Sequence, residues 1–192
     1  MTGSSFSFYN ADVLTPAGVA RAPLHIEKGV VASAPQSVAF DLDGFFVLPG
    51  IIDLHGDGFE RHLAPRRGAV KNLQTGFSAV QSELAAHGIT TACLAQFYSW
   101  EGGMRGPEFA EKFLQALRCF QQSSPLTLRA QLRFETHMLD HYERFADLCT
   151  RFQVPYIVFN DHIPHGALAA GKRPPRLTGQ ALKSGRNPEA HL

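Results

Sequence analysis

The pattern of hydrophobic positions divides the chain into two parts that follow different rules. Between residues 4 and 46, short apolar stretches alternate with polar residues and are interrupted by turn signals such as Glu27-Lys-Gly29 and Asp43-Gly44. Alternation with a period of two is typical of β-strands that bury one face. We therefore predict a small β-sandwich subdomain over residues 1–48.

After residue 50 the pattern changes to strands that alternate with helices. Three helix-like patterns follow. The first covers residues 75–87 and stops at Gly88, the second begins at Pro107, and Asp140 is predicted to cap the third. The predicted strands cover residues 51–55, 89–95, 126–135 and 154–160. This spacing predicts βα units on a parallel sheet, and the first strand is predicted to be buried.

The segment 161–192 departs from this alternation. It is dense in Pro, Gly and basic residues and shows little apolar periodicity. A long segment of this kind is usually functional or without fixed structure. We predict a long basic loop.

Composition excludes several classes of protein. Lys and Arg total 18 against 17 for Asp and Glu, so net charge does not favour nucleic acid or an acidic membrane surface as a partner. No apolar run reaches the ~18 residues of a membrane helix. The three cysteines are far apart, and the N-terminal residues show no signal-peptide pattern. The expected location is the cytoplasm.

Candidate chemistry lies where the predicted strands end. His55 and Asp57 follow the first strand, Glu135 and His137 end the third, and His162 follows the fourth. The carboxyl ends of parallel strands share one edge, and imidazole and carboxylate groups are ligands of divalent metals. We predict a metal site at His55, Asp57, Glu135 and His162, with His137 as a ligand or a hydrogen-bonding neighbour. The alternative, ordinary solvated strand ends, explains one such ending better than three.

Basic residues gather in two places despite the neutral total. One group follows the first strand. The other lies in the terminal segment and includes Lys183 and Arg186. Arginine suits phosphate oxygens because its planar group donates two parallel hydrogen bonds. The alternative is a solvated loop surface. The predicted substrate-binding residues are Arg61, His62, Arg66, Lys172, Arg173 and Arg176.

Several motifs resemble one family of enzymes. The stretch Val47-Leu-Pro-Gly-Ile-Ile-Asp-Leu-His55 resembles the first-strand motif of the amidohydrolase superfamily. The continuation Gly56-Asp-Gly-Phe-Glu-Arg-His-Leu-Ala-Pro-Arg66 resembles its phosphonate-catabolism branch, which hydrolyses α-D-ribose 1-methylphosphonate 5-triphosphate. That branch shares Asp57, where most members of the superfamily carry histidine. Residues 96–105, 132–135, 159–162 and 169–179 also resemble this branch.

The resemblance implies a fold, a cofactor and a reaction. The fold would be a (β/α)8 TIM-type barrel with a small β-sandwich, and residues 49–192 would form the N-terminal half of the barrel, since a complete barrel takes about 250 residues. A divalent metal ion (zinc, manganese or iron) would be held by His55, Asp57, Glu135 and His162, with Glu135 as the bridging ligand. The reaction would be hydrolysis of the small phosphorylated substrate to a 5-phosphate and pyrophosphate.

Two other functions stay open at this point. One is an amidohydrolase that acts on a C–N bond, which Asp57 and the basic segments disfavour. The other is a non-catalytic truncated fragment, since the family's later strands would supply a further histidine and a closing aspartate. Open sheet edges invite self-association, so a homo-oligomer is also expected.

Overall fold

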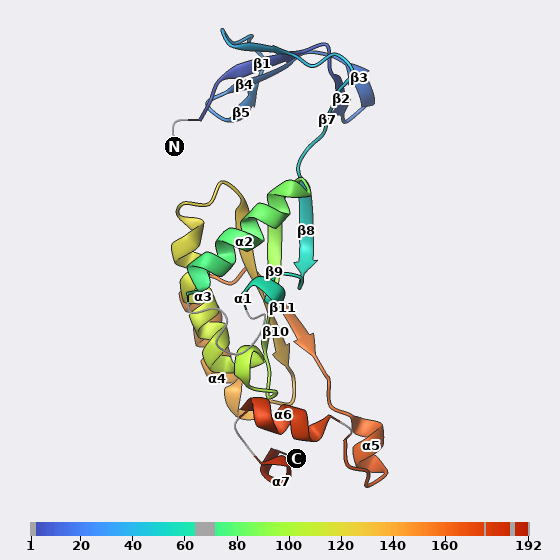
Figure 1. The fold of residues 1–192 in the computed structure, drawn as a ribbon, viewed down its shortest axis with the longest axis vertical. Helices are drawn as coiled ribbons and strands as arrows, with labels where there is room; N and C mark the ends of the chain where they lie inside the picture. Colours follow the sequence, from blue (N-terminus) through green and yellow to red (C-terminus); the bar gives the residue numbers. More distant parts are fainter. Residues whose placement is uncertain (1–2, 64–71, 175, 185–186, 192) are drawn as a thin grey trace. The chain divides into compact units, whose positions relative to one another are not determined.

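The computed structural model describes residues 3–63, 72–174, 176–184 and 187–191. The chain divides into two compact units at the junction of Gly50 and Ile51. Figure 1 shows short strands in the first unit and alternating strands and helices in the second.

The first unit consists of short strands in two mixed sheets. One sheet has the order β5-β4-β1-β6 and the other the order β3-β2-β7. In each sheet one pair is parallel, β1 with β6 and β2 with β7, and the other pairs are antiparallel. The strands are β1 (Phe6–Tyr9), β2 (Asp12–Thr15), β3 (Gly18–Arg21), β4 (Leu24–Glu27), β5 (Val30–Ala32), β6 (Ala39–Asp41) and β7 (Phe46–Val47).

The hairpin between β4 and β5 confirms the turn predicted at Glu27-Lys-Gly29. Lys28 and Gly29 both adopt positive φ, 52° and 82°, between the paired residues Glu27 and Val30. Two consecutive left-handed residues form the turn whose twist matches antiparallel strands, and glycine adopts this conformation without strain.

The first unit buries few apolar side chains. Ala11 and Val13 are buried, together with the hydrogen-bonded pair Ser7 and His25, whose Oγ and Nδ1 lie 2.8 Å apart. Many other apolar residues are exposed, among them Val19, Val30, Val31, Val38, Phe40, Phe45 and Phe46. The described strands therefore form no closed apolar core of their own.

The second unit contains one open parallel sheet of order β11-β10-β9-β8. Its strands are β8 (Ile51–Gly56), β9 (Ile89–Tyr98), β10 (Thr127–Glu135) and β11 (Tyr156–Asn160). The predicted (β/α)8 barrel is wrong. The described chain is a mixed α/β protein with three separate sheets, and β8 and β11 are the two edges of the parallel one. A barrel requires its first and last strands to pair, and these two do not.

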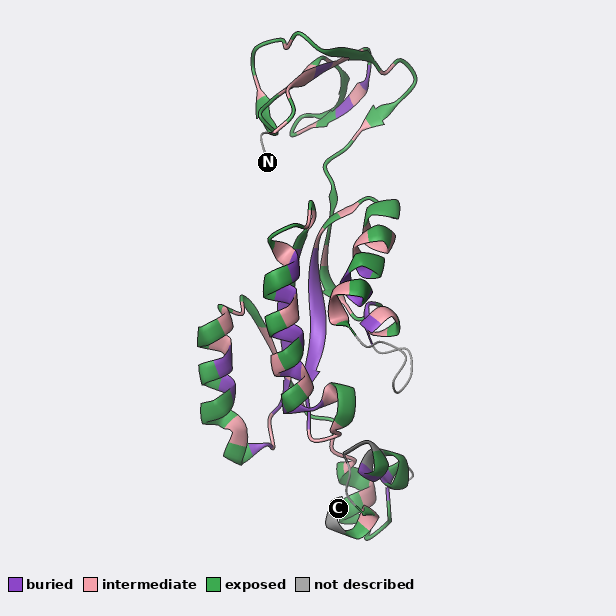
Figure 2. Cartoon of the chain, turned by 60° about the vertical axis from the view of Figure 1, so that its left-hand side comes forward, coloured by how far each residue is buried: buried purple, intermediate pink, exposed green. Residues whose placement is uncertain are grey.

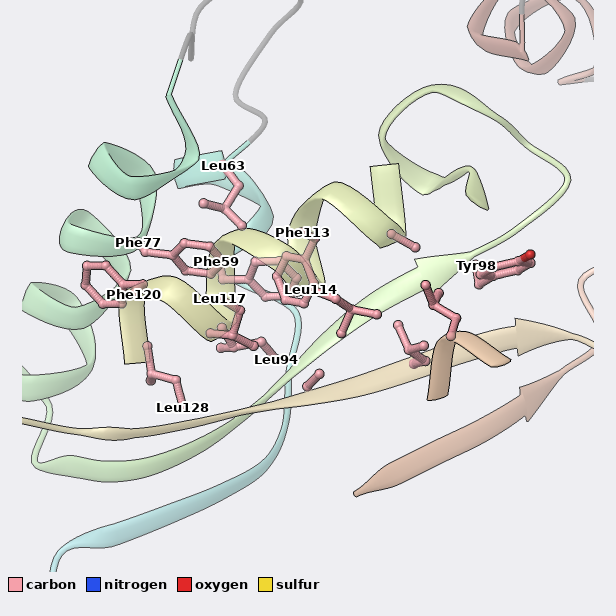
Figure 3. Close-up of a cluster of buried hydrophobic side chains, with 14 of the residues drawn as sticks. Phe59, Leu63, Phe77, Leu94, Tyr98, Phe113, Leu114, Leu117, Phe120 and Leu128 are labelled. Atoms are coloured by element: carbon pink, nitrogen blue, oxygen red, sulfur yellow. The ribbon is translucent and has the colours of Figure 1, made fainter. Parts of the chain in front are cut away.

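Helices alternate with these strands, as predicted, and cover one face of the sheet. They are α1 (Glu60–Leu63), α2 (Leu73–Ala86), α3 (Pro107–Gln121) and α4 (Tyr142–Phe152). Parallel strands in sequential order with right-handed crossovers place every helix on the same side. Buried positions run along one side of α3 and along β9 (Figure 2). Between them Phe113 lies among Phe59, Phe77 and Leu94, in the cluster of Figure 3.

Local sequence explains where α2 and α3 begin. Asn72 caps α2, because its side chain accepts a hydrogen bond of 2.8 Å from the backbone of Gln74. Pro107 opens α3, as predicted. The predicted cap at Asp140 is wrong. Asp140 lies in a 3-10 turn (Leu139–His141), and His141 precedes α4.

Two other predictions about the second unit are wrong. The strand at 51–55 is not buried: Ile52 and Leu54 are 62% and 64% exposed, because β8 is an edge strand. The segment 161–192 is not a plain loop, since it contains α5 (His165–Ala169), α6 (Leu177–Ser184) and α7 (Pro188–His191). Among the described residues, no helix has the length and apolar character needed to cross a lipid bilayer.

Replacement of Phe113 by alanine is expected to destabilise the protein by about 3–5 kcal/mol, because it leaves a cavity in a fully buried aromatic cluster. Urea unfolding measures the change. Leu139→Ala is the control: Leu139 is 75% exposed, so its removal should change stability by less than about 0.5 kcal/mol. Equal effects of the two substitutions would contradict the packing described.

The cysteines should react with iodoacetamide at different rates. Cys119 is exposed, whereas burial raises the pKa of the Cys149 thiol to about 11 and also raises the pKa of Cys93. Because the thiolate is the reactive form, mass spectrometry at about pH 8 should show one fast alkylation at Cys119. All three should react once urea unfolds the chain. Three fast sites in the native protein would contradict this order.

Candidate functional site

The four predicted metal ligands lie at the carboxyl ends of three strands of one parallel sheet. His55 is in β8 and Asp57 follows that strand, Glu135 ends β10, and His162 lies just beyond β11. The structure brings Glu135 and His162 into contact, while His55 and Asp57 are exposed. Within the described residues, no three His, Cys, Asp or Glu side chains form a group that could hold a metal ion. The four ligands are therefore not assembled in one cluster.

Glu135 and His162 form the best-defined polar contact at this edge. The Glu135 side chain is only 1% exposed. Its Oε2 accepts a hydrogen bond of 3.0 Å from the backbone of His162, and its Oε1 lies 2.5 Å from His162 Nδ1. A buried carboxylate is costly unless it is hydrogen-bonded, so these two contacts explain how it is accommodated.

His137 lies beside this pair. Its Nδ1 is 3.9 Å from Glu135 Oε2. Its ring packs edge-on against the ring of Trp100, and the two ring centres are 5.8 Å apart. Nδ1 is also buried, and no described residue forms a hydrogen bond with it. A carboxylate and two imidazoles thus meet at the end of β10 and β11.

The sheet face opposite the helices carries a polar row of side chains along β10. Side chains alternate along each strand, and parallel register places paired residues on the same face. Leu128, Leu132 and Phe134 of β10 pack into the helix-covered core, so the intervening residues point the other way. We call this opposite side the polar face, and its residues are Cys93, Ala95, Phe97, Arg129, Gln131, Arg133, Glu135, Tyr156, Val158 and Asn160.

Gln131 connects β10 to β8 across the strand between them. Its side chain is fully buried, and its Nε2 donates a hydrogen bond of 3.0 Å to the carbonyl of Leu54. The β9 residue that it passes is Ala95, whose small side chain leaves room for this contact. The pairing of β8 with β9 is irregular between Asp53 and Gly56, just where this carbonyl is used. The bond therefore holds the carboxyl end of β8 near the polar face.

Phe97 organises the charged groups of the polar face. The Arg133 guanidinium carbon lies 4.1 Å from the centre of its ring and that of Arg105 lies 4.2 Å away. The His162 ring centre is 6.2 Å from that of Phe97. Stacking of arginine on an aromatic ring fixes the guanidinium without using its hydrogen-bond donors.

Unpartnered polar atoms concentrate in this region. In the described chain, Gln131 Oε1, Arg133 Nε, His137 Nδ1 and Asn160 Nδ2 are buried and have no hydrogen-bond partner. All four belong to β10, β11 or the turn after β10. Buried polar atoms in native proteins are almost always hydrogen-bonded, so such a concentration indicates a surface completed by water or a ligand.

The predicted basic residues after β8 lie on the other side of the sheet or outside the described chain. Arg61 and His62 both pair with Glu83 of α2, and so they join α1 to α2. Arg66 and its neighbour Arg67 lie outside the described residues.

The predicted basic residues of the terminal segment are exposed. Lys172, Arg173 and Arg176 are all at the surface, and Arg173 forms an ion pair of 2.9 Å with Glu189. Arg186 and the side chain of Lys183 lie outside what the structure describes.

Asp161 and His165 form a separate pair just after β11. His165 Nε2 lies 2.7 Å from Asp161 Oδ2, and this hydrogen bond, with one from the backbone of Ile163, lowers the pKa of Asp161. Both side chains are exposed, and they position the start of α5 rather than the edge cluster.

The sequence prediction missed Arg105, Phe97 and Arg133. A signal for Arg133 was present: Arg129, Gln131, Arg133 and Glu135 occupy every second position of a predicted parallel strand. Parallel strands are normally buried on both faces, so a wholly polar face indicates a site. Arg105 had no such signal, because it lies in the turn after β9.

Comparison with known proteins adds no relative. No protein-family model matches the chain, and no curated protein matches it. The function must therefore be inferred from the residues at the carboxyl ends of the parallel strands and from the motifs around them.

Removal of the Glu135 carboxylate should destabilise the fold. Glu135→Ala leaves the backbone N–H of His162 without this acceptor, and the expected cost is about 1–3 kcal/mol in urea unfolding. Glu135→Gln keeps an acceptor oxygen and should cost less. Asp147→Ala, an exposed change on α4, should have almost no effect. If Glu135→Ala leaves the free energy of unfolding unchanged, the contact between Glu135 and His162 is not formed.

Proposed function

We propose that the protein is a metal-dependent hydrolase of phosphonate catabolism that releases pyrophosphate from α-D-ribose 1-methylphosphonate 5-triphosphate. The observation that carries the proposal is the buried Glu135 carboxylate between the imidazoles of His162 and His137. The motifs that run from Val47 to Arg66, which resemble this branch of hydrolases, support the choice of substrate.

The donor chemistry of this cluster suits a divalent metal ion. Carboxylate oxygen and imidazole nitrogen are the ligands that zinc, manganese and iron accept, and the buried His137 Nδ1 has no hydrogen-bond partner among the described residues. Glu135 and His162 would each supply a ligand, and His137, His55 and Asp57 are the further candidates. The described side chains do not yet form a group of three around one point. When bound, such an ion lowers the pKa of a bound water and neutralises phosphoryl charge.

The chain's own groups orient the site and attract the substrate. The contact of His162 Nδ1 with Glu135 fixes the imidazole and leaves Nε2 as its free ring nitrogen. Lys172 and Arg176 are exposed and, among the described residues, form no ion pair, so their charges are available to phosphate oxygens. Arg61 and His62 are less available, because Glu83 already binds both.

The test is pyrophosphate release from the ribosyl triphosphate in the presence of zinc, manganese or iron(II). Release should stop when a chelator removes the metal. Glu135→Gln and His162→Ala should each lower kcat/KM by about 100-fold or more, because each change removes a proposed ligand and the contact that orients the other. His87→Ala, which changes an exposed histidine that follows α2, is the matched control and should retain activity. No pyrophosphate with any of the three metals would contradict the proposal, as would full activity of both site variants.

A further inference from the structure

We propose that Arg133 and Asn160 form a phosphate-binding site on the polar face. This site would receive the triphosphate of the substrate next to the Glu135–His162 pair. The inference rests on the proposed function for the identity of the substrate. The site is defined by three observations about the described residues: an arginine without an ion pair, a ring that holds its guanidinium in place, and an unpartnered amide donor on the next strand.

Arg133 carries a positive charge that nothing described neutralises. Its Nε is buried and without a hydrogen-bond partner, and no described carboxylate lies within ion-pair distance. The carboxylate on the same face of β10, Glu135, is bound to His162 instead. A partly buried cation without a counter-charge is unfavourable, so an anion that pairs with Arg133 would be bound strongly.

Phe97 prepares this arginine for binding. The ring holds the Arg133 guanidinium by stacking, at 4.1 Å, so less side-chain entropy is lost when an anion arrives. Arg105 lies 4.2 Å from the same ring centre. Arg105 is already shared by Glu101 and Glu60, at 3.3 and 3.6 Å. Arg133 is therefore the guanidinium at this ring that has no described counter-charge.

Asn160 adds a neutral donor from the neighbouring strand. It pairs in register with Glu135, so it lies on the same face as Arg133 and further toward the carboxyl edge. Its Nδ2 is buried, and no described residue accepts a hydrogen bond from it. Together the two residues present unused N–H donors, which match a ligand that only accepts hydrogen bonds. A phosphoanhydride has several such oxygens and more than one negative charge, and arginine suits its geometry.

The experiment measures binding of inorganic pyrophosphate to the full chain in the presence of a chelator. Trp100 is the single tryptophan and contacts His137, so its fluorescence and calorimetry both report binding near the site. Arg133→Met is expected to weaken binding by about tenfold or more, the size of a lost charge-assisted hydrogen bond. Arg133→Lys keeps the charge but loses the planar guanidinium, and its affinity for pyrophosphate should lie between those of the wild type and Arg133→Met.

Arg129→Met is the matched control. Arg129 is on the same strand and the same face, but it is exposed and lies toward the amino end, so its loss should leave pyrophosphate affinity unchanged. Urea unfolding of each variant checks that it is folded. Absence of pyrophosphate binding to the wild-type chain, equal affinity of Arg133→Met and wild type, or equal loss in Arg129→Met would each overturn the inference.

Pyrophosphate binding in the presence of a chelator distinguishes the phosphate-binding site from the proposed hydrolase activity. Binding under chelation needs neither metal nor turnover, so it can be present when pyrophosphate release is absent. Conversely, pyrophosphate release with an unchanged KM in Arg133→Met would overturn the phosphate site and leave the hydrolase proposal in place.

Discussion

The parallel pairing of β9 with β10 is the constraint on which the second unit depends. These central strands pair over the whole run from Thr127–Thr91 to Phe134–Tyr98. The pairing decides which side chains share a face. Leucine and aromatic residues of both strands join the core under α2 and α3, and the alternate positions form the polar face. A slip of one residue would exchange the two sets, burying Arg133 in the core and exposing Phe134.

The polar face is electrostatically uneven, and the proposed function depends on this unevenness. Glu135 is satisfied by His162, whereas Arg133 is held by an aromatic ring and has no described counter-charge. A carboxylate–imidazole pair beside an unneutralised guanidinium suits a substrate that has phosphoryl oxygens and requires an activated water. The hydrogen bond from Gln131 to the carbonyl of Leu54 supports this arrangement, because it ties the end of β8 to β10.

Errors in the sequence prediction have identifiable causes. The apolar run at Ile51 and Ile52 was interpreted as a buried strand, but burial depends on what lies against a strand, and β8 is at an edge. The barrel was inferred from motifs, which do not report whether the first and last strands pair. In segment 161–192 the short α6 buries only Leu177 and Ala181 among its described side chains, too few to produce a clear periodic pattern.

The sequence by itself determined the alternation of strands and helices, the start of α3 at Pro107, the turn at Lys28 and Gly29, and the positions where polar residues follow strands. These features depend on local periodicity and on backbone preferences of single residues. Only the tertiary structure decided that the parallel sheet is open, that Arg105 and Arg133 share the ring of Phe97, and that Arg61 turns to Glu83. Such contacts join residues far apart in the chain, and no local pattern specifies which distant side chains will meet.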